Sequence, residues 1–472
     1  MIKTNKQPKR IYFMAICGTA MASLAAMLKE SGYKVYGSDS DVYPPMSTFL
    51  SEHNIDVFEG FSQKNLQPAP DLVVVGNVIS RGNEEIEYVL DHHIPYISLS
   101  DALREYFIRG RRSLVVTGTH GKTTTSSLLA WIFQRAGRNP GFLIGGIPKN
   151  FDRGYQVGGD EYFIVEGDEY DSAYFDKVAK FLRYIPDIGI INHLEFDHAD
   201  IYNSLDEIKL AFKRFVNLIP RNGLLAICSD FQNVVEISQK AFCPVLTFAI
   251  KDQHAVWKAE DITIGVKGMR FDVLYKGDFW GRVKTTLSGE HNVRNILAAI
   301  AVSHHEGIKR NEILRALSCF AGIKRRLEFK GLVKSAELYD DFGHHPTAIR
   351  ETLSGFRKKY SSRRIWALFE PRSATMRRNI FQRELAEALQ VADVILLAPI
   401  HRPDKAPAGQ ILSIEKLVQD LNSEHRTVQN FQSIDEIVQY VKRHIEENDV
   451  LITFSNGGFG GIHEKLIDLD KQ

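Results

Sequence analysis

The chain has 472 residues, of which 44% are hydrophobic and 25% are charged, the composition of an ordinary globular protein. At about 150 residues per domain, this length predicts two to three domains. The 59 lysines and arginines balance 58 aspartates and glutamates, so the net charge of +1 argues against a broad basic surface for nucleic acid or anionic membranes. The four cysteines lack metal or disulfide spacing, which is typical of a reducing, cytoplasmic compartment.

The amino-terminal segment has two possible interpretations. Residues 11–28 form an almost uncharged run behind a basic start, a pattern typical of a secretory signal. Gly18 interrupts this run, however, and residues 33–39 form a second apolar segment after it. Strand, helix and strand in this order favour the opening of an α/β domain. No later run reaches the roughly 18 apolar residues of a membrane helix, so we expect no membrane insertion.

Continuous apolar segments predict buried parallel strands in three successive units of the α/β class. They lie at 11–17, 33–39, 71–77 and 94–100 in the first unit (1–108), before Gly118 and at 161–167, 187–193 and 223–230 in the second (109–323), and at 364–371, 391–399 and 449–461 in the third (324–472). Alternating short strands at about 255–287 predict a small antiparallel insertion, and helices are expected at about 292–306 and 311–321.

Residues 115–125, VVTGTHGKTTT, carry the end of a phosphate-binding loop. An apolar strand runs into Gly118, a GKT triplet follows, and helical spacing comes next. Val116 replaces the first glycine of the usual pattern, which shortens the loop. Backbone N–H groups at the helix start attract phosphate, Lys122 would neutralise the terminal phosphates, and the Thr123 hydroxyl would bind Mg²⁺.

A second strand, FIVEGDEYD at 163–171, ends in a cluster of acids. Glu166, Asp168, Glu169 and Asp171 follow within six residues, at the carboxyl end where a parallel sheet binds its ligands. Hard oxygen ligands at such a position suit Mg²⁺. A solvated acidic loop is the alternative, and the neighbouring phosphate loop favours the metal site.

A third strand, INHLEFDHADIY at 191–202, ends in imidazoles and carboxylates. The neutral rings of His193 and His198 can bind a metal or accept a proton. The alternative is that Asp197 or Asp200 caps the following helix. Capping explains the acids but not the accumulation of histidines.

The segment LSGEHNVRNILAAIA at 287–301 places polar side chains at the start of a helix. Asn292 and Asn295 can read the edge of a base or cap the helix, and the local pattern favours capping. In the third unit, charged groups gather at strand ends around Arg326 and 340–347. Arginine there can clamp a phosphate or a carboxylate, and surface salt bridges are the alternative.

The turn AICGTAM at 15–21 keeps only Gly18 of the pattern G-x-G-x-x-G. Asp39, at the end of the next strand, lies near the distance of a ribose-binding acid. The turn can therefore hold a nicotinamide dinucleotide or, equally well, the diphosphate of another nucleotide.

Six motifs in this order resemble the Mur ligase family and span nearly the whole chain: GTHGKTTT, EGDEYD, HLEFDH, GEHNVRN, RRLE and YDDFGHHPT. AICGTAM, SDSDVYPPMST, VGNVISRGN, FDHADIY and SNGGFGGIHEKL are similar to those of members that join UDP-N-acetylmuramate to the tripeptide L-alanyl-γ-D-glutamyl-meso-diaminopimelate in peptidoglycan recycling. The resemblance implies ATP-dependent amide ligation through an acyl phosphate. Members that add L-alanine are the alternative. A nicotinamide-dependent oxidoreductase and a regulatory nucleotide-binding module are alternatives of other classes.

The resemblance also implies Rossmann-like domains at 1–108 and 324–472 around a P-loop domain at 109–323, with ATP and Mg²⁺ as cofactors and the UDP-sugar and a murein tripeptide as substrates. The implied UDP-sugar residues are Gly18, Thr19, Ala20, Met21, Asp39, Asn77 and Ser80. The implied ATP residues are Gly118, Thr119, His120, Gly121, Lys122, Thr123, Thr124, Asn292, Asn295, Arg326, Asp341 and His345. Thr123, Glu166 and His198 would bind metal, and Lys122, Glu166 and His198 would be catalytic. His193 stands where the family usually has asparagine.

Overall fold

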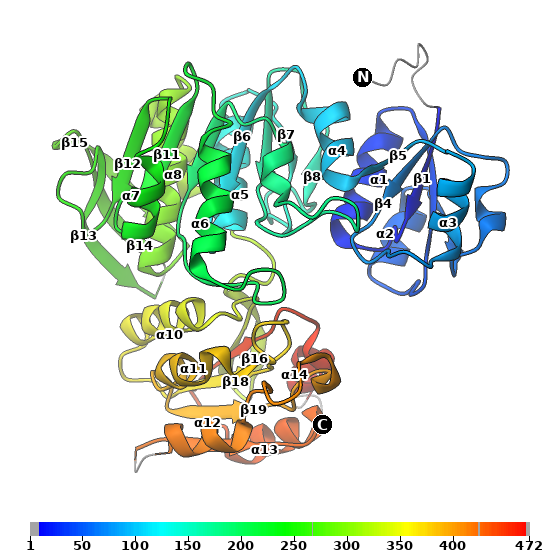
Figure 1. Ribbon diagram of the computed structural model, residues 1–472. Helices are drawn as coiled ribbons and strands as arrows, with labels where there is room; N and C mark the ends of the chain where they lie inside the picture. Colours follow the sequence, from blue (N-terminus) through cyan, green and yellow to red (C-terminus); the bar gives the residue numbers. More distant parts are fainter. Residues whose placement is uncertain (1–8, 267, 423–424, 469–472) are drawn as a thin grey trace.

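A computed structural model describes residues 9–266, 268–422 and 425–468. These residues form three sheets that follow one another along the chain, and helices pack against each sheet (Figure 1). Within these ranges, none of the helices has the length and apolar character needed to cross a membrane.

The first sheet is parallel and has the strand order β3-β2-β1-β4-β5. Its strands are β1 (Arg10–Met14), β2 (Lys34–Asp39), β3 (Asp56–Glu59), β4 (Leu72–Val75) and β5 (Tyr96–Ser98). Its helices are α1 (Thr19–Glu30), α2 (Met46–Glu52), η1 (Gln63–Leu66), α3 (Glu84–Asp91), α4 (Leu99–Leu103) and η2 (Arg104–Ile108). The uncharged run at 11–28 folds as β1 and α1 and is largely buried, as an α/β opening requires.

The central sheet has the order β15-β14-β13-β12-β11-β10-β6-β9-β7-β8. Its strands are β6 (Arg112–Thr117), β7 (Gly141–Leu143), β8 (Tyr155–Gln156), β9 (Tyr162–Glu166), β10 (Ile188–Ile191), β11 (Leu224–Cys228), β12 (Val245–Ala249), β13 (Trp257–Gly265), β14 (Gly268–Tyr275) and β15 (Asp278–Thr285). Its helices are α5 (Lys122–Arg135), η3 (Lys180–Arg183), α6 (Leu205–Val216), α7 (Gln232–Ser238), α8 (Glu290–His305) and α9 (Arg310–Ser318). The expected antiparallel strands are β13–β15, and β13 pairs in parallel with β12, so they extend the central sheet at its edge.

The third sheet has the order β16-β17-β21-β18-β19-β20 and is parallel except for β16 against β17. Its strands are β16 (Glu328–Val333), β17 (Ala336–Asp341), β18 (Ile365–Phe369), β19 (Val394–Leu397), β20 (Thr427–Asn430) and β21 (Val450–Phe454). Its helices are α10 (Pro346–Lys359), η4 (Asn379–Phe381), α11 (Gln382–Leu389), η5 (Pro403–Lys405), α12 (Ile414–Leu421), α13 (Ile434–His444), η6 (Phe459–Gly461) and α14 (Ile462–Ile467).

The helices α5 and α8 hold the central sheet rigid beneath its loops. Both are buried along most of their length, and Phe133 and Ile296 pack in the same core as Ile164 and Trp257 of the sheet. Each fully buried large apolar side chain contributes roughly 1.5–3 kcal/mol relative to exposure. Because this core is close-packed, the loops at the carboxyl ends of the strands stand on a fixed platform.

Candidate active site

Loops from all three sheets line one cleft of about 1620 Å³. In open parallel sheets, ligands bind at the carboxyl ends of the strands, and this cleft collects such ends from each sheet. Every site residue expected from the sequence lines it except two. Gly118 lies behind the phosphate loop, against the backbone of His193, and Ser80 is exposed at the surface.

The phosphate loop connects β6 to α5 with two glycines in left-handed conformations. Gly118 has φ +119°, and a Cβ atom there would lie 2.8 Å from the carbonyl oxygen of His193. Gly121 has φ +83° and directly precedes the first residue of α5. Among the described side chains, none caps this helix, so its first N–H groups face the cleft as an anion-binding site.

Two asparagines of α8 support the phosphate loop through a chain of side-chain hydrogen bonds. The Asn295 carbonyl oxygen accepts the Thr125 hydroxyl at 3.3 Å, and a Cβ atom on Gly121 would lie only 2.2 Å from it. Asn292 accepts from Asn295 at 3.2 Å and donates to the Ser288 carbonyl at 2.8 Å. The prediction that these asparagines cap their helix is wrong, because Gly289 is the N-cap of α8 and no side chain of the described residues caps it, while both asparagines lie inside the helix.

The ammonium group of Lys122 is buried and bound on two sides. It donates to the Gly118 carbonyl and to Glu169, each at 2.8 Å. Burial acts to lower the pKa of Lys122, but Glu169 and Asp168 raise it overall, so the side chain is charged. Glu169 also lies 3.4 Å from His198 Nε2. Burial opposes ionisation of Glu169, yet Lys122 and His198 outweigh it and hold the pKa of Glu169 at about 2.

Thr123 and Glu166 form the part of the cleft that fits a divalent cation. The Thr123 hydroxyl donates to Glu166 at 3.2 Å, and the other Glu166 oxygen accepts the Gly145 N–H at 2.9 Å. Burial and the nearby charge of Asp168 raise the pKa of Glu166 to about 7. A buried carboxylate beside a hydroxyl supplies the hard oxygen ligands of Mg²⁺, and a cation would relieve the cost of its charge. The third expected ligand, His198, contacts Glu169 instead.

The segment after β10 connects the central sheet to the C-terminal unit. Asp197 accepts the Thr375 hydroxyl at 3.0 Å, and the Ala199 carbonyl accepts from Arg378 at 2.7 Å. The helix-capping alternative for Asp197 and Asp200 is wrong, because Ser204 caps α6. These hydrogen bonds join residues of the central and C-terminal units that are more than 170 positions apart in the chain.

The C-terminal unit presents Arg326 and Asp341 to the cleft. Asp341 accepts the N–H groups of Gly343 at 2.7 Å and Leu327 at 2.9 Å. Burial raises the pKa of Asp341, although Arg326 opposes this shift. The Arg326 guanidinium lies over the Phe342 ring, 5.0 Å from its centroid. Arg326 and Asp341 therefore bring opposite charges to the same part of the cleft.

The N-terminal unit contributes the turn between β1 and α1. Asp39 closes β2 and accepts the N–H of Cys17 at 2.8 Å, which fixes the turn immediately before Gly18. Gly18 precedes α1, and no described side chain caps that helix. The turn therefore offers free N–H groups of a helix start to an anion in the cleft.

Two further buried polar residues line the cleft, and neither was expected from the sequence to bind a ligand or to act in catalysis. Asn192 donates to the Thr125 hydroxyl at 2.8 Å and helps to hold the phosphate loop. Lys180 has its ammonium 3.7 Å from Asp168 and 4.1 Å from the centroid of the Tyr170 ring, and burial lowers its pKa. Asn192 stands in the segment INHLEFDHADIY and belongs to the polar cluster that the sequence places at the end of this strand. Lys180 lies in the short helix η3, where no sequence pattern distinguishes it.

The loop before α5, its buried lysine and threonine, and the shared cleft define an enzyme of the P-loop class that uses a nucleotide. The family comparisons agree along the chain. Residues 10–111 match the catalytic domain of the Mur ligase family, residues 116–303 match its middle domain, and residues 325–457 match its glutamate ligase domain. The chain belongs to the Mur ligase family.

Three relatives illustrate the similarity. The UDP-N-acetylmuramate–L-alanyl-γ-D-glutamyl-meso-2,6-diaminoheptandioate ligase of Escherichia coli K12 is 40% identical over 462 residues, covering 97% of this chain and 98% of the relative. The UDP-N-acetylmuramate–L-alanine ligase of Dictyoglomus turgidum is 32% identical over 463 residues, covering 97% and 96%. The solved murein peptide ligase of Psychrobacter arcticus has a TM-score of 0.73 and 37% identity, covering 98% of each chain.

Proposed function

We propose that this protein is an ATP-dependent ligase that joins UDP-N-acetylmuramate to the tripeptide L-alanyl-γ-D-glutamyl-meso-diaminopimelate in peptidoglycan recycling. The observation that carries the proposal is the shared cleft, which the phosphate loop, the turn at Gly18 and the C-terminal loop at Asp341 all line. The 40% identity to a ligase whose name states these substrates supports the choice of substrates. The four cysteines are free, and free thiols are typical of a reducing compartment, which supports a location in the cytoplasm.

The three units divide the work as domains with boundaries at 1–108, 109–323 and 324–472. We assign the UDP-sugar to Gly18, Thr19, Ala20, Met21, Asp39, Asn77 and Ser80. We assign ATP to Gly118, Thr119, His120, Gly121, Lys122, Thr123, Thr124, Asn292, Asn295, Arg326, Asp341 and His345. Thr123 and Glu166 would hold Mg²⁺, which supplies charge neutralisation at the phosphates when bound. His198 stays a proposed ligand through its place beside Glu169, and binding of the metal there would displace the proton that Glu169 stabilises on the imidazole.

The first step activates a carboxylate. An oxygen of the lactyl carboxylate attacks the γ-phosphorus of ATP, the bond from that phosphorus to the bridging oxygen breaks, and ADP leaves with an acyl phosphate remaining. Lys122 stabilises the charge on the transferring group by position and electrostatics rather than by covalent chemistry. The N–H groups at the start of α5 orient the phosphates toward the carboxylate.

The second step forms the amide. The amine of the tripeptide attacks the acyl carbon, a tetrahedral intermediate forms, and phosphate leaves as the carbon–oxygen bond breaks while the amine loses a proton. Burial opposes ionisation of His198, but Glu169 and Asp197 raise its pKa to about 9. In this arrangement the imidazole is already protonated at neutral pH, so a carboxylate or phosphate oxygen is the better acceptor for the amine proton. The contacts from Asp197 and Ala199 to the C-terminal unit favour a closed cleft that excludes water from the acyl phosphate.

The decisive experiment measures ADP release with UDP-N-acetylmuramate and a panel of amines. We expect release with the tripeptide to exceed release with L-alanine. Release with L-alanine alone would instead identify the single-amino-acid ligase of the same family. ATP-independent turnover with a change in nicotinamide absorbance would identify an oxidoreductase, and nucleotide binding without substrate-dependent release would identify a regulatory module.

A further inference from the structure

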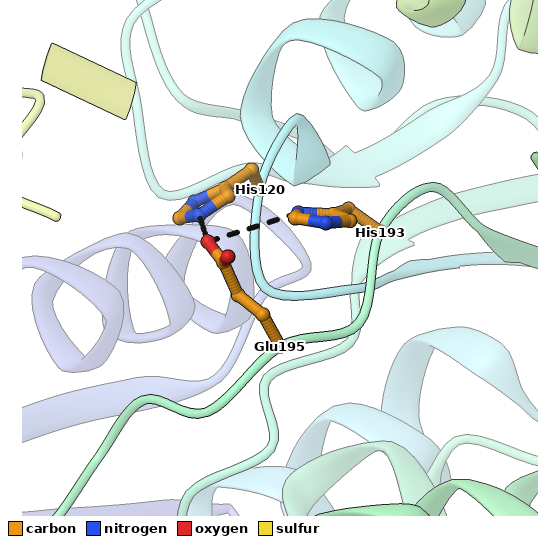
Figure 2. A group of neighbouring side chains, drawn as sticks. All are labelled: His120, His193 and Glu195. Atoms are coloured by element: carbon orange, nitrogen blue, oxygen red, sulfur yellow. Dashed lines mark hydrogen bonds and ion pairs between the residues drawn. The ribbon is translucent and has the colours of Figure 1, made fainter. Parts of the chain in front are cut away.

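A second group of potential metal ligands lies beside the phosphate loop, separate from Thr123 and Glu166. His120 stands on the loop itself, and His193 and Glu195 follow β10 (Figure 2). One ligand atom from each of the three side chains lies within 4.8 Å of the others. The side chains are 20%, 14% and 24% exposed, so the cluster is largely shielded from solvent. We call these three residues the His120 cluster.

The donor atoms lie close enough together for a small tetrahedral ion to bind between them once the side chains rotate. His193 Nδ1 lies 3.8 Å from Glu195 Oε1, and His120 Nε2 contacts the same oxygen. Tetrahedral coordination at about 2.0–2.1 Å places neighbouring ligand atoms about 3.3 Å apart. Small side-chain rotations would therefore bring the three donors to a common ion. Two imidazoles and one carboxylate suit Zn²⁺, whereas Mg²⁺ prefers oxygen ligands throughout.

Backbone contacts hold the two segments of the cluster together before any ion binds. The N–H of Thr119 donates to the His193 carbonyl at 2.8 Å, and the Thr119 hydroxyl accepts the Glu195 N–H at 3.1 Å. The His193 ring lies on Phe231, with centroids 3.9 Å apart, which restricts its rotation. Ligands that are positioned by neighbouring contacts bind metal more tightly than mobile ones.

His345, from the start of α10, lies at the open side of the His120 cluster. Its Nδ1 is 3.1 Å from Glu195 Oε1, and its Nε2 is 3.2 Å from the Phe196 carbonyl. A proton on Nε2 would be donated to that carbonyl, which leaves the Nδ1 lone pair directed toward the cluster. Thr347 N–H also contacts Nδ1, at 3.3 Å, and would compete weakly for it. The fourth coordination position is therefore open to water or to this imidazole.

We propose that His120, His193 and Glu195 form a binding site for a transition-metal ion of the Zn²⁺ type, distinct from the Mg²⁺ site at Thr123 and Glu166. The bound ion fastens the phosphate loop to the segment after β10.

Zn²⁺ competition between the untagged, chelator-treated protein and a chromophoric chelator tests the site. We expect the wild type to bind one equivalent of Zn²⁺ in the presence of excess Mg²⁺. His193→Asn and Glu195→Gln should each weaken Zn²⁺ binding by about 10-fold or more. His254→Asn, which changes an exposed histidine outside the cluster, should leave the affinity unchanged. Circular dichroism confirms that each variant is folded.

Co²⁺ provides an independent readout of coordination. The wild type should give the intense visible absorption of a four- or five-coordinate Co²⁺ ion, and His193→Asn should lose it. Equal Zn²⁺ affinity in the wild type, His193→Asn and Glu195→Gln would overturn the proposal, because the three side chains would then be only a hydrogen-bonded cluster. A six-coordinate Co²⁺ spectrum displaced by Mg²⁺ would overturn it as well. Neither result would affect the proposed ligase reaction, which uses the other metal site.

Discussion

The Lys122 ammonium and the Glu169 carboxylate form an ion pair at 2.8 Å, with side chains that are only 12% and 3% exposed. Lys122, which should neutralise the phosphates of the nucleotide, is therefore held by the carboxylate of Glu169. A nucleotide would have to share or replace this contact. The pair keeps the Lys122 ammonium charged and in place until the terminal phosphates arrive.

Replacing this lysine should stop the reaction without unfolding the protein. In Lys122→Ala, ADP release should fall by about 10²–10³-fold or more, because a positioned charge on the transferring phosphoryl group is lost. Lys465→Ala removes an exposed lysine paired with Asp435 and should leave ADP release unchanged. Circular dichroism and thermal melting would verify the fold of both variants. Normal turnover in Lys122→Ala would exclude the proposed mechanism.

Alanine substitutions at two glycines can distinguish the effect of backbone strain from the effect of side-chain crowding at the phosphate loop. Gly121 and Gly137 flank α5 with φ +83° and +75°, so alanine at either position costs about 1–2 kcal/mol in backbone conformation. A Cβ atom at Gly137 meets nothing within 4 Å, whereas one at Gly121 would collide with Asn295.

Gly121→Ala should therefore weaken ATP binding by about 10-fold or more, since displacing Asn295 at a cost of about 1.4 kcal/mol already changes affinity tenfold. Gly137→Ala should lower the free energy of unfolding by the backbone cost of about 1–2 kcal/mol, and its affinity for ATP should equal that of the wild type. Isothermal titration with a non-hydrolysable ATP analogue would compare the two variants. Equal affinities would show that the Asn295 contact has no part in nucleotide binding.

We expect ADP release to depend on Mg²⁺ and this dependence to require the carboxylate of Glu166. Removal of divalent cations by chelation should abolish ADP release, and Mg²⁺ should restore it. Glu166→Gln should raise the Mg²⁺ concentration for half-maximal release by about 10-fold or more, because a hard anionic ligand is lost. Glu161→Gln alters an exposed acid just before the same strand and should behave as the wild type. If Glu166→Gln needs the same Mg²⁺ concentration as the wild type, Glu166 is not a ligand of the metal and the proposed site is wrong.

The sequence predicted the parts of the fold that depend on neighbouring residues. The strands before the phosphate loop and the acid cluster are continuous apolar runs, and both are found as β6 and β9. The short edge strands β3 and β20 were not expected, because they are partly exposed and carry little hydrophobic pattern. The Mur ligase family and the three α/β units also followed from the ordered motifs.

Interactions across long sequence separations could not be predicted in this way. Asn295 contacts Thr125, 170 residues earlier, whereas its place near the start of α8 gave only the local signal for capping. His198 was expected beside Glu166 but contacts Glu169, because the order of residues in a motif does not fix which carboxylate a ring reaches. The expected boundaries at 108/109 and 323/324 fall between the sheets and stay predictions.

A buried ion pair near the cleft links stability to pH. Arg294 Nε lies 2.7 Å from Asp230 Oδ2, and the side chains are 9% and 1% exposed. Asp230 also accepts the N–H groups of Ile250 at 3.0 Å and Lys251 at 2.7 Å. Burial opposes ionisation, but Arg294 and these N–H groups hold the pKa of Asp230 below its ordinary value.

Asp230→Asn should lower the free energy of unfolding at pH 7 by about 3 kcal/mol, because buried Arg294 loses its partner at 2.7 Å and keeps only the carboxylate of Glu351, 3.8 Å away. A depressed pKa in the folded state means that ionised Asp230 stabilises the protein above the unfolded value of about 3.9, and that this contribution is lost as the pH falls through the folded value. Urea denaturation followed by tryptophan fluorescence should therefore show a gap between wild type and variant that is constant above about pH 5 and shrinks below about pH 4. Asp435→Asn, in an exposed pair with Lys465, should change stability by less than about 0.5 kcal/mol throughout. A gap that widens as the pH falls would contradict the assigned role of Asp230.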